Sequence, residues 1–388
     1  MEKYSILIIR GEVGTGGVAR STMTLLSMIN YNKTNVDLLI LNQKDPALGE
    51  VPPQVNRIRT KTRNPYGTWF YKKSWRDMCK TPFLLLRRIL SHVLAKMFRN
   101  NYYKYRYILR DRAIGLQKKY DMVLAMQDNS SLLYMIKKTQ AVQKVFWYHI
   151  WEYNPTQAEF KFHKQSFLLT NKIFTVSSDM CEKFRKNFSE SQDKINVLKN
   201  PVNSQYVIEK STENIKDLLR ENRTKIITVG RLSKEKGFDL AVVSCSQLIK
   251  RGFSVSWYIV GEGPYRRKIE ELIHIYGLEK HFTLLGKKNN PYPYMKQADI
   301  YVQPSYVETF CYTIAEAKIL NLPVVSTETL GAKTQIINHY NGILTDITSE
   351  AISKGIIRLI KDKDLMYKIT NNLKKDRYIN DDFFNKIM

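Results

Sequence analysis

The feature that most constrains the fold is an alternation, begun twice along the chain, of short β-favouring apolar runs with longer stretches of helical spacing. Such alternation predicts parallel sheets covered by helices on both faces. The strands expected in the first half are Tyr4–Ile9, Val36–Leu41, Met122–Met126, Lys144–Tyr148, Lys172–Val176 and Ile195–Leu198. Those expected in the second half are Lys225–Val229, Val255–Val260, Phe282–Leu285, Ile300–Gln303 and Val324–Ser326. We therefore expect an α/β chain with two doubly wound, Rossmann-like domains whose parallel sheets face each other across a cleft.

A length of 388 residues also suits two domains, each large enough to bury a full core. The first domain is predicted at residues 1–203 and the second at 204–370. The boundary is placed near Asn200–Asn203, before a charged helix expected at Ser211–Glu221. A C-terminal helical segment, residues 371–388, is expected to pack back on the first domain.

The positive charge is concentrated in one stretch of the first domain. The chain carries 62 Lys and Arg against 36 Asp and Glu, a net charge of +26, and residues 51–120 alone hold 18 basic and 2 acidic side chains. This stretch fits the alternation poorly and is interpreted as a basic, aromatic-rich insertion. A local surplus of this size implies an anionic partner, which could be nucleic acid, acidic lipid or an acidic substrate.

Within this insertion, Thr81–Phe98 has the pattern of an amphipathic helix. Basic residues lie outside its apolar stripe or directly after it, at Arg87, Arg88, Lys96 and Arg99. Such a helix, flanked by aromatic residues, is typical of an interfacial membrane contact, so these four residues are assigned to an acceptor or membrane side. A core-packed helix with a solvated basic face is the alternative, and interleaved aromatic and basic residues also suit single-stranded nucleic acid.

Three further observations narrow the class of protein. No apolar run approaches the roughly 18 residues of a membrane span, and the N-terminal residues are too short and too charged for a signal peptide. The four cysteines lie far apart, with no C-x-x-C pair. We expect a soluble, cytoplasmic protein with neither a metal site nor a disulfide framework.

Two glycine-bounded loops follow expected strands and are candidate phosphate sites. Gly14–Gly17 comes after the first strand and precedes a helix, whose free N–H groups could face an anion. A tight turn between strand and helix explains it equally well. Gly230–Gly237 carries Arg231 and Lys236, two cations that would suit a diphosphate. Basic loop residues are more often only solvated.

The remaining candidates are two carboxylates and one imidazole. Glu308 is expected just before a helix and Glu316 inside it, so their spacing puts one carboxylate at the helix start and the other two turns deeper. Carboxylates accept hydrogen bonds from vicinal diols. His149 ends an expected strand and could face the cleft, although a lone histidine is more often structural.

Four motifs occur in a fixed order in the second half, and together they are specific. They are Val229-Gly230-Arg231-Leu232 with Lys236-Gly237, Val260-Gly261-Glu262-Gly263-Pro264, Ala298-Asp299 with Gln303-Pro304-Ser305, and Glu308-Thr309-Phe310 through Glu316-Ala317 with Pro323-Val324-Val325. In order and spacing, residues 225–346 resemble the retaining, nucleotide-sugar-dependent glycosyltransferases of family 4, which have the GT-B fold. The first half matches more loosely, through Gly14–Gly17, His149, Val176-Ser177 and Asn200-Pro201-Val202.

The resemblance implies a role for each matching residue. Arg231 and Lys236 match the pair that binds the donor diphosphate, and Glu316 matches the carboxylate on the ribose hydroxyls. Glu308 matches the carboxylate near the donor sugar, and His149 the histidine that reaches toward the transferred sugar. The positions assigned to donor binding through backbone groups are Gly16, Gly17, Phe310, Cys311 and Tyr312.

The resemblance also implies the reaction and its setting. We expect transfer of a sugar, with retention, from a nucleoside diphosphate donor, by default a UDP-sugar, without a metal or other cofactor. The acceptor would be a lipid-linked or cell-surface polysaccharide intermediate, met at the inner face of the cell membrane. The family commonly has Gly where Cys311 and Asn321 stand, and Cys311 would narrow the sugar pocket.

Two other functions are consistent with the same residues. A sugar-nucleotide epimerase or a phosphorylase would share the two-domain architecture. A basic module that binds anionic lipid or nucleic acid, with cleft motifs that have lost their role, belongs to a different class. The complete set of Arg231, Lys236, Glu308 and Glu316 argues against such decay, and no nucleic-acid partner is expected.

Overall fold

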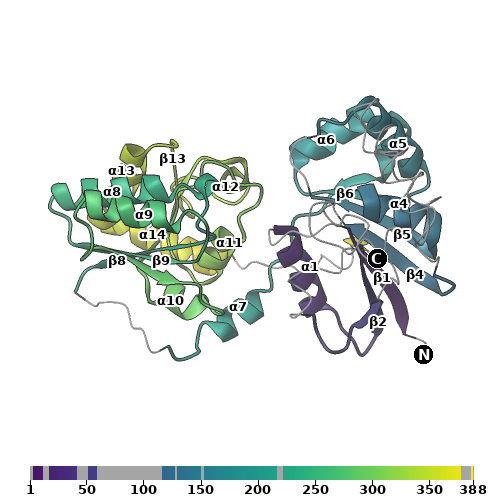
Figure 1. Cartoon of the computed structure of the whole chain (residues 1–388), viewed down its shortest axis with the longest axis horizontal. Coiled ribbons are helices and arrows are strands. Elements are labelled where there is room, and N and C mark those ends of the chain that lie inside the picture. Colours follow the sequence, from purple (N-terminus) through teal and green to yellow (C-terminus); the bar gives the residue numbers. More distant parts are fainter. Residues whose placement is uncertain are drawn as a thin grey trace, which may run out of the picture. The chain divides into compact units, whose positions relative to one another are not determined.

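The computed structural model describes residues 3–11, 17–41, 51–58, 116–126, 129–149, 153–215, 222–376 and 386–387. The chain divides into two compact units, shown in Figure 1. Unit 1 comprises Met1–Pro201 and Asp381–Met388, and unit 2 comprises Val202–Asn380. Each unit is an α/β body with its own sheet and core.

Unit 1 is built on a seven-stranded sheet in the order β3-β2-β1-β4-β5-β6-β7, with every neighbouring pair parallel. Its strands are β1 (Tyr4–Arg10), β2 (Thr34–Ile40), β3 (Asn56–Ile58), β4 (Lys119–Met126), β5 (Gln140–Tyr148), β6 (Lys172–Thr175) and β7 (Ile195–Val197). The α-helices in its described part are α1 (Gly17–Met28), α4 (Asn129–Lys138), α5 (Gln157–Leu168) and α6 (Ser178–Asn187).

Both faces of this sheet are buried, as its apolar strands predict. Along β1, Ile6 and Ile8 pack into one hydrophobic cluster, whereas Leu7 and Ile9 pack into the cluster on the opposite face. Successive side chains of a strand point to opposite faces, so a strand covered on both sides must be apolar throughout. The doubly wound prediction for the first half is confirmed.

Unit 2 repeats the arrangement with a six-stranded parallel sheet in the order β10-β9-β8-β11-β12-β13. Its strands are β8 (Thr224–Val229), β9 (Val255–Val260), β10 (Phe282–Gly286), β11 (Ile300–Gln303), β12 (Val324–Thr327) and β13 (Ile343–Thr345). Its helices are α7 (Ser204–Lys210), α8 (Phe238–Lys250), α9 (Arg266–Ile275), α10 (Tyr292–Gln297), α11 (Tyr312–Ile319), α12 (Leu330–Lys333), α13 (Ser349–Lys361) and α14 (Lys363–Lys375).

The helix predicted at Ser211–Glu221 is wrong over its described part. The chain forms α7 earlier, because the Asn203 side chain accepts a hydrogen bond from the Tyr206 amide and caps its start. The Ser211 hydroxyl donates to the Ile208 carbonyl as the helix ends, and residues 211–215 form turns and irregular backbone. The rest of the predicted helix, residues 216–221, lies outside the described residues.

The unit boundaries differ from the predicted domain limits. The first falls two residues before 203, whereas the second falls ten residues after 370. Leu373 of α14 packs in the core of unit 2, so the predicted limit at 370 cuts through a helix of that unit. Ile387 packs in unit 1, and the Lys172 ammonium donates to its carbonyl at 3.2 Å.

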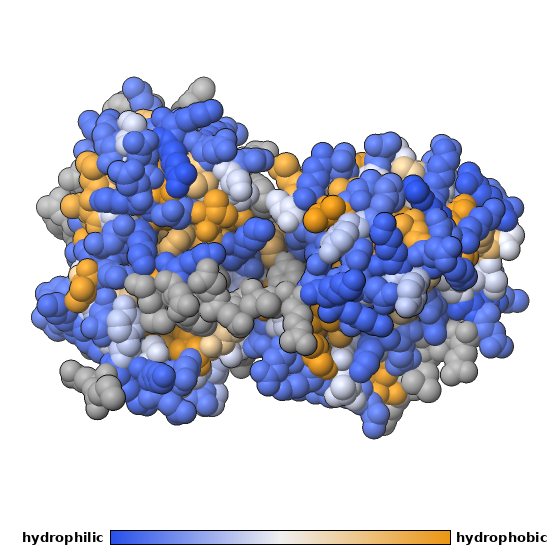
Figure 2. Space-filling view, turned by 180° about the vertical axis from the view of Figure 1, so that it is seen from behind, coloured by the Kyte–Doolittle hydropathy of each residue, from blue (hydrophilic) through white to orange (hydrophobic). Residues whose placement is uncertain are grey.

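The surface on the side drawn in Figure 2 is mixed, with hydrophobic residues in scattered groups among hydrophilic ones. No helix in the described part of the chain is both long enough and apolar enough to cross a membrane.

Candidate active site

The Gly230–Gly237 loop leaves the carboxyl end of β8, a strand in the interior of the sheet of unit 2. Close backbone packing fixes its course. A Cβ atom on Gly261 would lie 1.8 Å from the Gly230 carbonyl oxygen, and one on Gly237 would lie 2.0 Å from that of Pro304. Gly237 also has a φ of +64°, which side chains disfavour. These glycines therefore hold the loop against the segments after β9 and β11.

Lys236 and Glu308 form an ion pair at the centre of this region. The Lys236 Nζ atom lies 2.6 Å from Glu308 Oε1, with side-chain exposures of 26% and 7%. Burial alone would lower the pKa of Lys236, but the Glu308 carboxylate outweighs it and the pKa is raised. The ammonium is therefore charged and held in place. Arg231, at the start of the same loop, is exposed.

The Glu308 carboxylate is oriented by donors on one oxygen only. Oε1 also accepts a hydrogen bond from the Ser305 hydroxyl at 2.9 Å and from the Gln303 side-chain amide at 3.2 Å. Among the residues that the structure describes, no hydrogen bond reaches Oε2. This second oxygen is available to accept a hydrogen bond from a ligand hydroxyl.

The segment from Phe310 to Tyr312 leads into α11 beside Glu308. Cys311, the residue before the helix, has a φ of 60° in the left-handed region, which explains why glycine suits this position better. Within the described ranges, the backbone N–H groups of Phe310 and Cys311 donate no hydrogen bond. The Gln335 side chain instead binds the Phe310 and Cys311 carbonyl oxygens. The arrangement leaves amide donors free at a helix start, where anions and polar ligands bind.

Glu316 lies inside α11, as the spacing predicts, but only a little over one turn from its start at Tyr312 and not two, and its side chain is only 1% exposed. Its Oε1 atom accepts a hydrogen bond from the Tyr292 hydroxyl at 3.2 Å. Tyr292 opens α10, so this carboxylate is held between two helices of unit 2.

His149 follows β5 in unit 1 and is 8% exposed. Burial lowers its pKa to about 3, and a side-chain hydrogen bond with Asn200 acts in the opposite direction. Asn200 in turn accepts from the Ser21 hydroxyl of α1 at 3.3 Å. The Nε2 atom has no hydrogen-bond partner in the described part of the chain. The imidazole is therefore neutral near pH 7, with one nitrogen unpaired.

The structure gathers most of the predicted site residues of the second half at one edge of unit 2. Gly17 opens α1 in unit 1. Gly16, Arg87, Arg88, Lys96 and Arg99 lie outside the described residues. The sequence reasoning assigned no role to Gln303, Ser305 and Gln335, which position the site. A glutamine in an otherwise buried apolar strand is the signal that could have identified Gln303.

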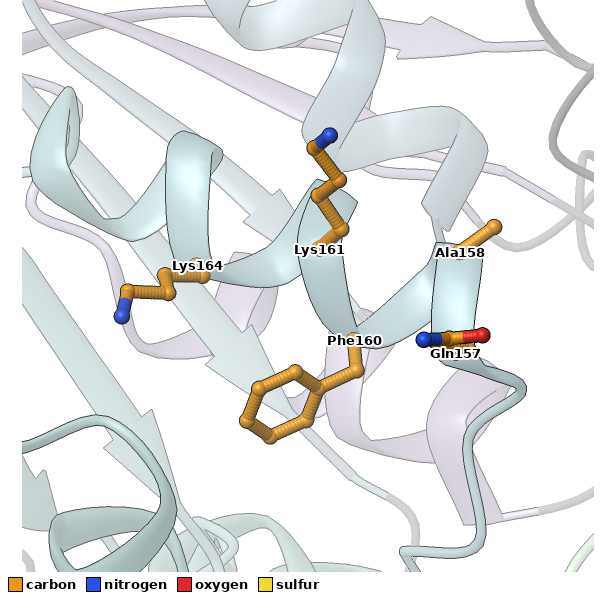
Figure 3. Close-up of a pocket in the computed structure, with 5 residues that line it drawn as sticks. All are labelled: Gln157, Ala158, Phe160, Lys161 and Lys164. Atoms are coloured by element: carbon orange, nitrogen blue, oxygen red, sulfur yellow. The ribbon is translucent and has the colours of Figure 1, made fainter.

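A surface hollow of about 450 Å³ lies along α5 and is shown in Figure 3. Its described lining consists of Gln157, Ala158, Phe160, Lys161 and Lys164, and includes no predicted site residue. Among the described residues, no group of three or more His, Cys, Asp or Glu could hold a metal ion.

Comparison with protein families gives one match inside this chain. Residues 209–376, which contain the whole Lys236–Glu308–Glu316 region, match the family described as glycosyl transferases group 1.

Curated relatives carry related names. The chain is 26% identical over 389 residues to the N-acetylgalactosamine-N,N'-diacetylbacillosaminyl-diphospho-undecaprenol 4-alpha-N-acetylgalactosaminyltransferase of Campylobacter jejuni, covering 96% of this chain and 94% of that protein. It is also 26% identical over 149 residues to the capsular polysaccharide biosynthesis glycosyltransferase CapM of Staphylococcus aureus, covering 38% and 39% of the two chains.

Solved structures share the fold over the full length. A glycosyltransferase from Rickettsia africae superposes with a TM-score of 0.74 at 20% identity, covering 100% of this chain and 97% of that one. HepE of Anabaena, solved in complex with UDP, gives a TM-score of 0.66 at 15% identity, covering 99% and 98%.

Proposed function

Because this chain is a glycosyltransferase with the GT-B fold, whose residues 209–376 belong to glycosyl transferases group 1, we propose that it moves a sugar from a nucleoside diphosphate sugar with retention of anomeric configuration. One observation carries the proposal: the Lys236–Glu308 pair, with Glu308 buried and Lys236 partly buried, lies beside unpaired backbone N–H groups at the start of α11. A cationic donor, an anionic acceptor and neutral backbone donors are thereby combined in a single site.

Lys236 and Arg231 neutralise the diphosphate as it leaves. An ammonium has three donors, and Glu308 occupies one of them, so Lys236 can face the carboxylate and a phosphate oxygen together. Arg231 adds a second cation from the same loop. Negative charge that develops on the leaving group is stabilised by donors already in position, which is the largest contribution in many enzymes.

Glu308 orients the transferred sugar rather than attacking it. Three donors share its Oε1 atom and hold the carboxylate in place, while Oε2 is left for a sugar hydroxyl. The departing diphosphate itself accepts the proton of the acceptor hydroxyl. His149, neutral and with Nε2 unpaired, contributes a hydrogen bond to the sugar from unit 1.

No metal ion is needed for this chemistry, because two side-chain cations in one loop supply the positive charge that a divalent ion supplies elsewhere. Glu316 binds the ribose hydroxyls, since a carboxylate accepts well from a vicinal diol. UDP is the proposed nucleotide, supported by the UDP-bound HepE structure of the same fold.

The proposed acceptor is a lipid-linked or polysaccharide intermediate at the inner face of the cell membrane, with the enzyme peripherally bound in the cytoplasm. The support comes from the relatives, one named for a diphospho-undecaprenol substrate and one for capsular polysaccharide biosynthesis.

The proposal is tested by measuring the unfolding temperature of the protein in the presence of each member of a panel of nucleoside diphosphate sugars. We expect one UDP-sugar to raise it, and NMR of the product to show the donor's anomeric configuration preserved. Inversion would contradict the retaining mechanism, and isomerised donor without transfer would indicate an epimerase.

A further inference from the structure

The amino-terminal edge of the unit 1 sheet carries a row of lysines that the proposed reaction does not use. Six of the seven strands begin at a lysine or within two residues of one. These lysines are Lys3, Lys33, Lys119, Lys138, Lys172 and Lys194. Because all strands are parallel, their starts lie along one edge, opposite the edge where ligands bind in such sheets.

Further lysines lie near this row, and they outnumber the acidic residues that could neutralise them. Lys118, Lys137 and Lys144 lie beside the same strand starts. Asp37 binds Lys118, and Asp121 is occupied by the amide and hydroxyl of Ser5, both at 2.7 Å. In the sheet of unit 2, only two of the six described strands, β8 and β10, begin within two residues of a lysine, Lys225 and Lys280. The lysine edge is therefore a property of unit 1.

Exposed apolar side chains lie among these lysines. Val142, Leu168 and Leu169 are 63%, 51% and 58% exposed. Leu168 ends α5, and its carbonyl accepts a hydrogen bond from the Lys194 ammonium at 3.0 Å. The Asn171 amide, just before β6, donates to the Lys144 carbonyl two residues after Val142. Cations and apolar side chains thus share one surface.

We propose that this lysine edge docks unit 1 on an anionic lipid bilayer. Lysines at the edge attract acidic headgroups, while leucine and valine side chains enter the boundary between headgroups and acyl chains. A nucleic-acid backbone would satisfy the lysines but offer nothing to Leu168 and Leu169. The purpose of docking rests on the proposed function, because it brings the enzyme to a lipid-linked acceptor.

The geometry sets where the ligand edge of unit 1 lies. The seven residues of β1 span roughly 23 Å at about 3.3 Å per residue. An edge bound to the bilayer therefore holds the opposite edge at about that height. The acceptor that suits this arrangement is a lipid-linked glycan whose growing end extends away from the membrane.

Sedimentation of the full chain with lipid vesicles tests the proposal. We expect binding to phosphatidylcholine vesicles that contain about 30% of the anionic lipid phosphatidylglycerol, and no binding to vesicles of phosphatidylcholine alone. The variant Lys33→Gln/Lys119→Gln/Lys137→Gln/Lys138→Gln should lose at least about 100-fold in affinity. The variant Val142→Ser/Leu168→Ser/Leu169→Ser should also bind more weakly.

A matched control removes four exposed lysines from unit 2 instead, as Lys354→Gln/Lys363→Gln/Lys368→Gln/Lys374→Gln. Equal loss in both fourfold variants would overturn the proposal, because net charge alone would explain it. So would tight binding of single-stranded DNA that depends on the four edge lysines and not on the apolar residues. Stabilisation by a UDP-sugar is measured separately, so a failure of docking is distinguished from a failure of the proposed reaction.

Discussion

The two units share a fold but differ in the charge of their candidate functional residues. In unit 2, the partly buried Lys236 pairs with the buried Glu308, which also accepts hydrogen bonds from Ser305 and Gln303. In unit 1, the described candidate is a single imidazole, His149, whose burial keeps it neutral. We therefore expect unit 2 to stabilise a charged leaving group, whereas the imidazole of unit 1 can offer only an uncharged hydrogen bond.

The substitution expected to have the largest effect on this difference between the units is Lys236→Ala. If unit 2 stabilises the departing diphosphate, turnover should fall about 100- to 1,000-fold, because a preorganised charged donor is lost while Glu308 keeps two neutral donors. The measurement is the rate at which nucleoside diphosphate is released from the nucleoside diphosphate sugar that raises the unfolding temperature. Lys234→Ala, an exposed lysine of the same loop, is the control and should remain near wild type. Equal activity of the two variants would remove Lys236 from the mechanism.

The second prediction concerns the backbone that supports this pair. Gly237→Ala forces a Cβ atom to within 2.0 Å of the Pro304 carbonyl oxygen at a φ of +64°. Gly277→Ala imposes nearly the same φ, +63°, with no atom within 4 Å. We expect about 1 to 2 kcal/mol of destabilisation from backbone strain in Gly277→Ala and clearly more in Gly237→Ala. Urea unfolding measures both, and equal losses would show that close packing at Gly237 is unimportant.

The third prediction separates the nucleotide from the transferred sugar within unit 2. Glu316→Gln keeps the shape of the side chain but removes the charge, so donor affinity should fall about 10- to 100-fold with the fold intact. Calorimetry of donor binding measures the change, and Glu271→Gln on the exposed face of α9 is the control. An unchanged dissociation constant for Glu316→Gln would exclude the ribose role.

The smallest expected effect tests the neutral imidazole of unit 1. The pKa of His149 is about 3 when folded and near 6.5 when unfolded. Between these values the unfolded chain binds a proton that the folded chain does not, so stability falls as the pH drops below about 6.5.

Replacing this residue with glutamine should remove up to about 1.4 kcal/mol of that loss per pH unit. The measurement is urea unfolding of wild type and His149→Gln at pH 7 and pH 5. His163, whose pKa burial lowers to about 4, is retained in both proteins and contributes equally. An identical pH dependence would show that burial does not lower the pKa of His149 in the folded protein.

The sequence predicts the fold well where the signal is local. Continuous apolar strands identify both sheets, and the Lys236 loop and the Glu308–Glu316 spacing are motifs within single segments. Residues that act across the fold leave a weaker signal: Gln335 binds the Phe310 carbonyl from 25 positions away, and Gln303 approaches Glu308 only because β11 ends there. Short elements such as β3 and α7 depend on pairing and capping, which periodicity does not detect.

The lysine edge is also not predicted by the order of residues along the chain. Composition drew attention to residues 51–120, whereas these lysines are spread from Lys3 to Lys194 and come together only through the parallel register of the sheet. Charge that is dispersed in sequence can therefore be concentrated in space.

The most direct test of the account is calorimetric titration of UDP into the full chain in buffer containing a chelator of divalent ions. We predict binding of one UDP per chain without metal, weakened at least about 100-fold in the variant Arg231→Ala/Lys236→Ala, because the two cations of the loop neutralise the diphosphate. Binding that requires added Mg²⁺, or equal affinity of the double variant and wild type, would contradict the central claim that unit 2 supplies this charge itself.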